Sequence, residues 1–328
     1  MTENKALIRP GNAAGTLPRR ECLQAMGAAL LGAQALAAPA DELRAKAKKN
    51  LKLGIDARVY ARLPLEEAAR KIKADGFTAV LTDYTFADVR FNPLDPDWEA
   101  ARKITDCLAR QEIKIAAIFG YYNVVDPELQ RRKQGEARME CFLSNWKRLG
   151  CPVISTETGT LNAKSQWLES PENAGEAAFR QCRAALERMA RTAEKAGAIL
   201  SIEPYWRNVI DSVERAERLF REVRSPALRL VMDPCNYFRK EDLARMQPML
   251  AEMFRRLGDR IVVAHAKDVK ASAEGTDLPA AGKGGLDYPL YLRLLAQLDR
   301  EMPLLLEHLA AADVARARDY VLAQLERI

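Results

Sequence analysis

One stretch of the sequence decides how the fold is interpreted: Ala198-Ile199-Leu200-Ser201-Ile202-Glu203-Pro204-Tyr205-Trp206. A short, largely apolar run ends at Glu203, and Pro204 has no backbone N–H to continue strand pairing within a sheet. Apolar runs of this length are typical of parallel strands that are buried on both faces. We therefore predict a buried strand whose carboxyl end presents the side chain of Glu203 at the edge of the sheet.

Three later stretches repeat this pattern of an apolar run followed by a polar side chain. The runs are residues 228–232, 261–264 and 303–306, and they are followed by Asp233, His265 and Glu307. Because the carboxyl ends of parallel strands meet at one edge of a sheet, we expect these side chains to lie beside Glu203. Three carboxylates and one imidazole form an oxygen-rich set that suits one divalent metal ion. We predict Mn²⁺, and Mg²⁺, Co²⁺ or Zn²⁺ would also be compatible with this set.

The chain from residue 51 onward alternates short apolar runs with longer segments of helical periodicity. The predicted strands are residues 51–56, 77–82, 113–119, 151–156, 198–203, 228–232, 261–264 and 304–306. Helices are predicted over residues 65–74, 97–111, 174–196, 212–223, 241–257, 287–298 and 313–326, with another that ends near residue 149. Eight such units predict an α/β protein with a single (β/α)8 TIM barrel and the metal site at its carboxyl-terminal rim.

An open, doubly wound sheet is the alternative architecture for alternating strands and helices. Such sheets usually carry a G-x-G-x-x-G turn after the first strand. Residues 57–60 of this chain are Ala-Arg-Val-Tyr, which do not match that turn. The barrel is therefore favoured.

The first 40 residues have the three-part layout of an export signal. Arg19 and Arg20 are followed by a weakly apolar run over residues 22–36 and then by the small residues 38–40. The arginine pair resembles a twin-arginine motif, so we predict a signal at residues 1–40, a barrel domain at residues 41–328 and a periplasmic or otherwise exported protein. Cleavage after residue 37 and an amphipathic helix belonging to the fold are alternatives.

Composition restricts the class of protein. Of the 328 residues, 48% are hydrophobic and 29% charged, which is typical of a globular protein with a substantial core. The net charge of +6 includes no Lys/Arg block that would indicate nucleic-acid binding, and beyond the signal no run approaches the ~20 apolar residues that span a bilayer. The six cysteines form no C-x-x-C pair, which argues against a zinc knuckle or a disulfide framework; a single disulfide is left open.

Several segments resemble the sugar phosphate isomerase/epimerase family, the xylose isomerase-like barrels, over residues 51–328. They are Ile202-Glu203-Pro204, Met232-Asp233-Pro234-Cys235-Asn236, His265-Ala266-Lys267-Asp268, Gly282-Lys283-Gly284-Gly285-Leu286-Asp287-Tyr288 and Leu306-Glu307-His308, with Gly120-Tyr121-Tyr122-Asn123 and Thr156-Glu157-Thr158-Gly159 in the first half. Two positions depart from the family pattern. Tyr205 stands where many members have His, and Cys235 stands where sugar-contacting residues are common, so both departures concern the binding of the substrate.

The resemblance implies a metal-dependent isomerase or epimerase acting on a sugar, keto-sugar or cyclitol. Glu203, Asp233, His265 and Glu307 would hold the metal, and the two glutamates would also exchange protons next to a carbonyl through a metal-stabilised enediolate. Substrate-binding roles are predicted for Tyr121, Glu157, Trp206, Asn236, Lys267 and His308. Alternation along the strand would turn His308 away from its neighbour Glu307.

Three other functions compete with this prediction. A 3-keto-glycoside lyase would use the same proton abstraction, and export favours contact with glycosides. A non-catalytic sugar-binding barrel is a further alternative. A nuclease related to the endonuclease IV branch needs several histidines for three zinc ions, and the chain has only two. We therefore expect a small-molecule carbohydrate as the partner, with no nucleic acid and no membrane after signal removal, and leave homo-oligomerisation open.

Overall fold

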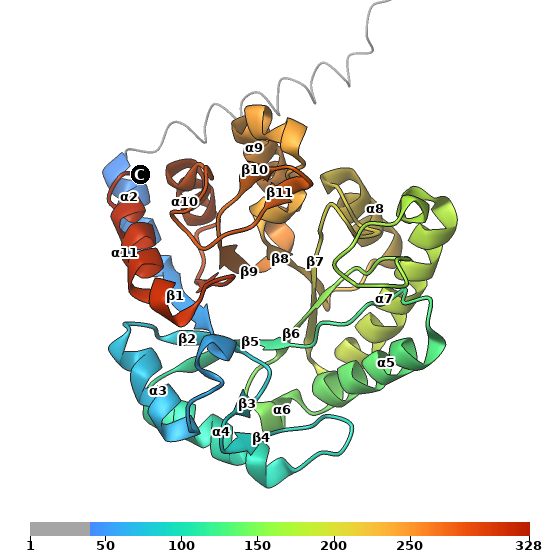
Figure 1. The fold of residues 1–328 in the computed structure, drawn as a ribbon, viewed down its shortest axis with the longest axis horizontal. Helices are drawn as coiled ribbons and strands as arrows, with labels where there is room; N and C mark the ends of the chain where they lie inside the picture. The colour runs from blue at the N-terminus through green and yellow to red at the C-terminus, as the bar shows by residue number, and fades with distance from the viewer. Residues whose placement is uncertain (1–39) are drawn as a thin grey trace, which may run out of the picture. The chain divides into compact units, whose positions relative to one another are not determined.

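Eight parallel strands close into a barrel in the computed structural model, which describes residues 40–328 (Figure 1). Their order around the barrel is β1-β12-β9-β8-β7-β6-β5-β2. The strands are β1 Leu51–Asp56, β2 Ala79–Thr82, β5 Lys114–Phe119, β6 Val153–Glu157, β7 Ile199–Glu203, β8 Leu228–Met232, β9 Ile261–Ala266 and β12 Met302–Leu306. The predicted (β/α)8 TIM barrel is confirmed.

Helices surround the barrel and connect successive strands (Figure 1). They are α3 Leu65–Ala74, α4 Trp98–Arg110, α5 Leu129–Ser144, α6 Trp146–Leu149, α7 Glu176–Ala196, α8 Val213–Val223, α9 Met246–Leu257, α10 Tyr288–Gln297 and α11 Val314–Leu325. Their ends follow local chemistry. The Ser212 side chain caps α8 by accepting a hydrogen bond from the Arg215 N–H, and Gly197 ends α7 with a left-handed φ of 70°.

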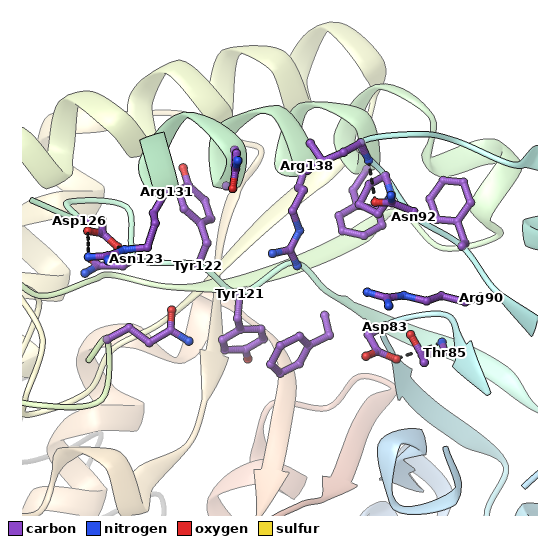
Figure 2. Close-up of a pocket in the computed structure, with 18 residues that line it drawn as sticks. Asp83, Thr85, Arg90, Asn92, Tyr121, Tyr122, Asn123, Asp126, Arg131 and Arg138 are labelled. Carbon is purple, nitrogen blue, oxygen red and sulfur yellow. Dashed lines mark hydrogen bonds and ion pairs between the residues drawn. The ribbon is translucent and has the colours of Figure 1, made fainter. Parts of the chain in front are cut away.

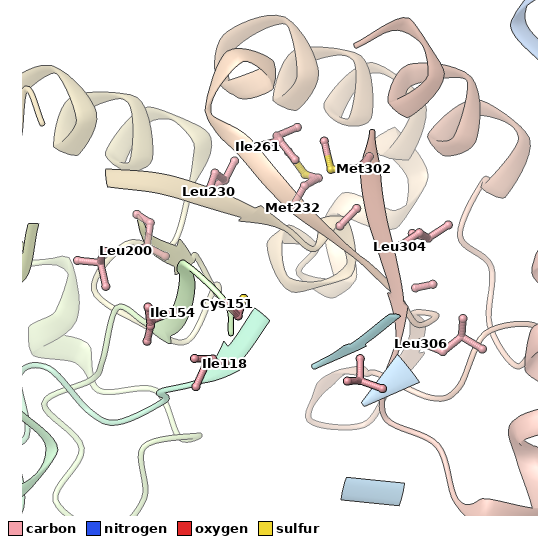
Figure 3. Close-up of a cluster of buried hydrophobic side chains, with 14 of the residues drawn as sticks. Ile118, Cys151, Ile154, Leu200, Leu230, Met232, Ile261, Met302, Leu304 and Leu306 are labelled. Atoms are coloured by element: carbon pink, nitrogen blue, oxygen red, sulfur yellow. The ribbon is translucent and has the colours of Figure 1, made fainter. Parts of the chain in front are cut away.

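Alternation of side chains along each strand divides the core into two parts. Leu305 points into the barrel, where it joins a small apolar cluster. Its neighbours Leu304 and Leu306 belong to the larger apolar layer between the strands and the helices, part of which Figure 3 shows. The interior is so tight that a Cβ on Gly54 would lie 2.5 Å from the carbonyl oxygen of Ala79. The packed interior gives the strand ends a rigid base.

Some elements were not predicted from the sequence. Helix α2, Ala40–Asn50, precedes β1. It is linked to the C-terminal part of the chain by an ion pair of 2.7 Å between Lys48 Nζ and Glu326 Oε1. Two small antiparallel sheets lie in loops: β3 Thr85–Phe86 with β4 Val89–Arg90, and β10 Lys270–Ser272 with β11 Gly275–Asp277. The helix predicted over residues 241–257 starts as a 3-10 turn, and α9 itself begins at Met246.

The predicted export signal lies outside the described residues, except for Ala40, so it stays a prediction. Within residues 40–328, no helix combines the length and the apolar composition needed to cross a bilayer. The disulfide left open by the sequence is not formed, because all the cysteines of this part of the chain are free: Cys107, Cys141, Cys151, Cys182 and Cys235.

Candidate metal centre and cavity

Four adjacent strands bring the predicted metal ligands together. Glu203 is the last residue of β7, and His265 is the penultimate residue of β9. Asp233 and Glu307 directly follow β8 and β12. These strands are consecutive neighbours in the barrel, so their ends form one continuous arc. All four side chains are buried, and one ligand atom from each lies within 4.8 Å of the other three. The group could hold a metal ion.

The donor atoms fit a divalent cation. Nδ1 of His265 lies 3.3 Å from Glu203 Oε1, 3.4 Å from Asp233 Oδ2 and 3.4 Å from Glu307 Oε1. Neither ring nitrogen of His265 has a hydrogen-bond partner among the described residues, although buried polar atoms are normally paired. A buried nitrogen without a partner, surrounded by three carboxylate oxygens, is the donor set that a divalent metal satisfies.

Lys267 adds a positive charge to the cluster. Its Nζ lies 2.6 Å from both Asp233 Oδ2 and Glu307 Oε1, and 3.9 Å from Glu203 Oε1. Burial raises the pKa of Asp233 to about 6, although Lys267 acts in the opposite direction. Burial also opposes ionisation of Glu307, but the charges of His265 and Lys267 hold its pKa well below the usual range. The predicted substrate-binding lysine is therefore also bound to the candidate ligands.

Both oxygens of Glu203 are held by neighbouring side chains. The Tyr121 hydroxyl donates a hydrogen bond to Oε2, and Asn236 Nδ2 donates one of 2.7 Å to Oε1. Across the sheet, the register of β6 and β7 aligns Glu157 with Glu203. Burial, reinforced by the negative charge of Glu203, raises the pKa of Glu157 well above its usual range. Glu157 is thus suited to donate a hydrogen bond as a neutral carboxyl group.

A cavity of about 290 Å³, which we call the catalytic cavity, opens above these groups. Seven residues predicted for the site line it: Tyr121, Glu157, Glu203, Asn236, Lys267, Glu307 and His308. Asp233 and His265 are buried and do not line it. The two glutamates therefore face the space for a substrate, whereas the other two candidate ligands lie behind them.

His308 deviates from the alternation expected for a strand. Its backbone has a φ of 54°, in the left-handed region, which ends the extended conformation directly after Glu307. The ring is not turned away: Nε2 lies 3.9 Å from Glu307 Oε1, and Nδ1 lies 3.0 Å from the carbonyl oxygen of Leu278. His308 therefore belongs to the wall of the catalytic cavity.

Trp206, for which a substrate-binding role is predicted, is not among the residues that line the catalytic cavity. Its Nε1 donates a hydrogen bond of 3.2 Å to Thr276 Oγ1, and the guanidinium groups of Arg207 and Arg239 lie 4.5 Å and 4.8 Å from its ring. The neighbouring Tyr205 lines the cavity instead. The reason is that the chain leaves β7 at Pro204, where regular alternation of side chains ends.

Sequence reasoning missed Arg58, which also lines the catalytic cavity. Asp56, at the end of β1, binds Arg58 by an ion pair of 2.5 Å from Nη2 to Oδ2, and the guanidinium lies 3.7 Å from the ring centroid of Phe119. The sequence feature that could have indicated Arg58 is Asp56, a carboxylate at the end of the first strand that can pair with a nearby arginine. Trp167, in the loop after β6, also lines the cavity, but nothing in the local sequence indicates where that loop lies.

Comparisons with known proteins agree with this architecture. The model of the xylose isomerase-like TIM barrel matches residues 67–324, and no curated protein sequence matches the chain. Solved structures with a similar fold include three that are compared by identity, coverage of each chain and TM-score. A xylose isomerase-like TIM barrel protein from Mycobacterium smegmatis in complex with magnesium is 17% identical (85% of this chain, 97% of that chain, TM-score 0.61). The apo 3-keto-D-glucoside 4-epimerase from E. coli is also 17% identical (85% and 100%, TM-score 0.63).

The third structure is the IOLI protein with a binding zinc atom, which is 13% identical (84% and 97%, TM-score 0.59). At these identities the structural likeness shows the fold. The match to the family model covers most of the chain and confirms the resemblance inferred from the sequence. The chain belongs to the xylose isomerase-like TIM barrel family.

Proposed function

We propose that this protein is a divalent-metal-dependent enzyme that isomerises or epimerises a sugar, a keto-sugar or a cyclitol by moving a proton next to a carbonyl group. The observation that carries the proposal is the convergence of Glu203, Asp233, His265 and Glu307 below a cavity, with the His265 nitrogens unpartnered among the described residues. The epimerase named among the similar structures acts, by its title, on a 3-keto-D-glucoside, which supports a carbonyl-bearing substrate.

The metal and the two glutamates divide the chemistry. A divalent cation held by the four residues would polarise a carbonyl and stabilise the negative charge that develops when a neighbouring carbon loses its proton. Glu203 ends β7 and Glu307 follows β12, the two ends of the four-strand arc, and both line the cavity. One glutamate can remove a proton and the other can return it to the opposite face, which is the requirement for epimerisation.

Neighbouring side chains orient Glu203 for proton transfer. Tyr121 and Asn236 each bind one of its oxygens, so the carboxylate has a fixed direction. On the other side, Lys267 binds Oε1 of Glu307 at 2.6 Å. Arg58, Glu157 and His308 complete the polar wall and offer hydrogen-bond donors to sugar hydroxyl groups.

Elimination from a 3-keto-glycoside is the second candidate. The same base would remove the proton from the carbon between the carbonyl and the anomeric carbon, the bond to the aglycone oxygen would break, and an alcohol would leave with a proton. A larger cavity that shares two wall residues with the catalytic cavity supports this version, because an aglycone needs space beyond one sugar ring.

Incubation of the metal-loaded protein with keto-sugars and 3-keto-glycosides in D₂O tests the proposal. Isomerase or epimerase chemistry would give a product of unchanged skeleton with deuterium next to the carbonyl. Elimination would instead release the aglycone. Metal-dependent binding of sugars with no exchange in any substrate would contradict enzymatic function and support a sugar-binding barrel.

Export through the twin-arginine-type signal is part of the proposal. It rests on the sequence of residues 1–40 alone. Replacing Arg19 and Arg20 together by lysine should retain the protein in the cytoplasm at its full mass, because the signal receptor requires the arginine pair. Secretion of the double variant at the wild-type level would contradict this assignment.

A further inference from the structure

A second and larger cavity, of about 490 Å³, adjoins the catalytic cavity (Figure 2). Its walls come from residues 83–94 around β3 and β4, the end of β5 with the loop after it, and one side of α5. Phe119 and Tyr121 line both cavities, and their rings stack with centroids 4.2 Å apart. Because the Tyr121 hydroxyl binds Glu203, only one aromatic ring separates the second cavity from a proposed catalytic carboxylate.

Three arginines line this second cavity, which we therefore call the arginine cavity: Arg90, Arg131 and Arg138. Arg131 is neutralised, since its Nη2 lies 2.8 Å from Asp126 Oδ1. Arg90 and Arg138 differ from it. Figure 2 shows both side chains extending toward the cavity, and neither makes an ion pair or a hydrogen bond within residues 40–328.

The remaining groups of the wall compensate these two charges only in part. Asp83 makes no ion pair in the part of the chain described, but it interacts electrostatically with Arg58, burial raises its pKa, and its Oδ1 accepts a hydrogen bond from the Thr85 N–H. Gln134 and Gln166 add two side-chain amides that make no hydrogen bond to described residues. The cavity therefore has an excess of unpartnered donors and of positive charge.

Such a wall is suited to an oxyanion. Arg138 is half-buried and makes no ion pair with described residues, so its guanidinium N–H groups are available to an acceptor in the cavity. Arginine binds carboxylates and other oxyanions through two parallel N–H donors. Neutral sugar hydroxyl groups would satisfy the amides but would leave the excess positive charge of the wall uncompensated.

We propose that the arginine cavity binds the acidic second unit of a two-part substrate, a glycoside whose aglycone or second sugar carries a carboxylate or a related oxyanion. This assignment rests on the proposed function, because the reacting sugar would occupy the catalytic cavity. The glycosidic link would pass the Phe119–Tyr121 pair that lines both cavities. Arg90 and Arg138 would bind the oxyanion and select this class of substrate over a free monosaccharide.

Calorimetric titration of the metal-loaded full chain with matched glycosides tests the proposal. The probes are 4-carboxyphenyl β-D-glucopyranoside and phenyl β-D-glucopyranoside, which differ only in the carboxylate. We expect the carboxylated glycoside to bind about tenfold more tightly, the factor of one charge-assisted hydrogen bond. In an R90Q/R138Q variant this preference should disappear, whereas affinity for phenyl glucoside should stay unchanged.

Lys133→Gln is the matched control. It removes one positive charge from the same helix, α5, but Lys133 is exposed and does not line the arginine cavity. The control should retain the full preference for the carboxylated probe. If the double variant is poorly folded by circular dichroism, R90Q alone gives the test, because Arg90 is exposed and its loss leaves no buried gap.

Two further arms separate the sources of binding. Benzoate and inorganic sulfate carry the oxyanion without the sugar. If these anions bind in an arginine-dependent manner and the carboxylated glycoside does not, the cavity is a site for a free anion and the proposal of a two-part substrate is overturned. No preference in the wild type, or a preference that survives in the double variant, would also overturn it. Failure of the proposed function gives a different pattern: no deuterium exchange with any keto-sugar, while arginine-dependent binding of the carboxylated glycoside persists.

Discussion

The two halves of the barrel rim contribute differently to the site: the proposed reacting groups lie in the second half, whereas the first half supplies wall residues. In the second half, four consecutive strands end in the candidate metal ligands and in both proposed acid–base groups. In the first half, the strand ends carry Asp56, Asp83 and Phe119, loops contribute to the walls of both cavities, and α5 contributes to that of the arginine cavity. Groups that exchange protons need fixed positions, which hydrogen-bonded strands supply, whereas recognition can be built on variable loops. The comparison predicts different kinetic effects for the two halves.

Replacing Glu307 by Gln should produce the largest effect. The amide cannot exchange a proton, so turnover should fall about 10²–10⁴-fold, while bound metal is largely kept because an oxygen ligand remains. Turnover and metal content by mass spectrometry are the measurements. Glu301→Gln is the control: Glu301 directly precedes the same strand at its opposite end, is exposed and pairs with Lys114. Unchanged turnover in the Glu307 variant would exclude Glu307 as a proton-transfer group.

His265→Ala should abolish stable metal binding. It removes the only nitrogen donor of the cluster, and metal affinity should fall by more than about 100-fold, since even outer contacts of metal ligands contribute about 10–100-fold. His308→Ala is the matched control because this second histidine lies in the cavity wall and outside the cluster. Equal metal content in both variants after reconstitution would contradict the proposed site.

Arg58→Lys, in the first half, should mainly weaken substrate binding. Lysine keeps the charge but loses the planar fork that pairs with Asp56 and stacks on Phe119. We expect KM to rise about tenfold, the value of one hydrogen bond to a charged group, with kcat nearly unchanged. Arg62→Lys, an exposed position nearby, should change neither constant. A fall in kcat as large as that of the Glu307 variant would break the division between the two halves.

The same division explains what the sequence could predict. Each strand of the second half runs directly into its functional residue, so periodicity and one rule about strand ends identify Glu203, Asp233, His265 and Glu307 together. The strands and helices follow from the same alternation. Helix α2 was missed because a short polar helix at residues 40–50 has no strand pattern beside it to reveal its packing.

Loop residues could not be predicted in this way. The position of Trp167 depends on the path of a long loop, and that of Arg138 on the docking of α5, and neither follows from local sequence. The orientation of His308 depends on one left-handed backbone angle. These positions are determined by tertiary packing. The sequence therefore indicates that the loops contain polar and aromatic side chains, but it does not indicate which of these side chains face the cavity.

Trp206→Phe should have the smallest effect on catalysis, and it tests whether Trp206 contributes to the substrate-binding surface. The substitution removes the hydrogen bond from Nε1 to Thr276 Oγ1 and weakens the contacts with two arginines. We expect the free energy of unfolding to fall by about 1 kcal/mol in urea titration, with KM unchanged. Tyr205→Phe, one residue away, should raise KM and leave the stability nearly unchanged, because the side chain lines the cavity and its hydroxyl makes no hydrogen bond among the described residues. A rise in KM for the Trp206 variant at full stability would extend the substrate-binding surface beyond the residues that line the catalytic cavity.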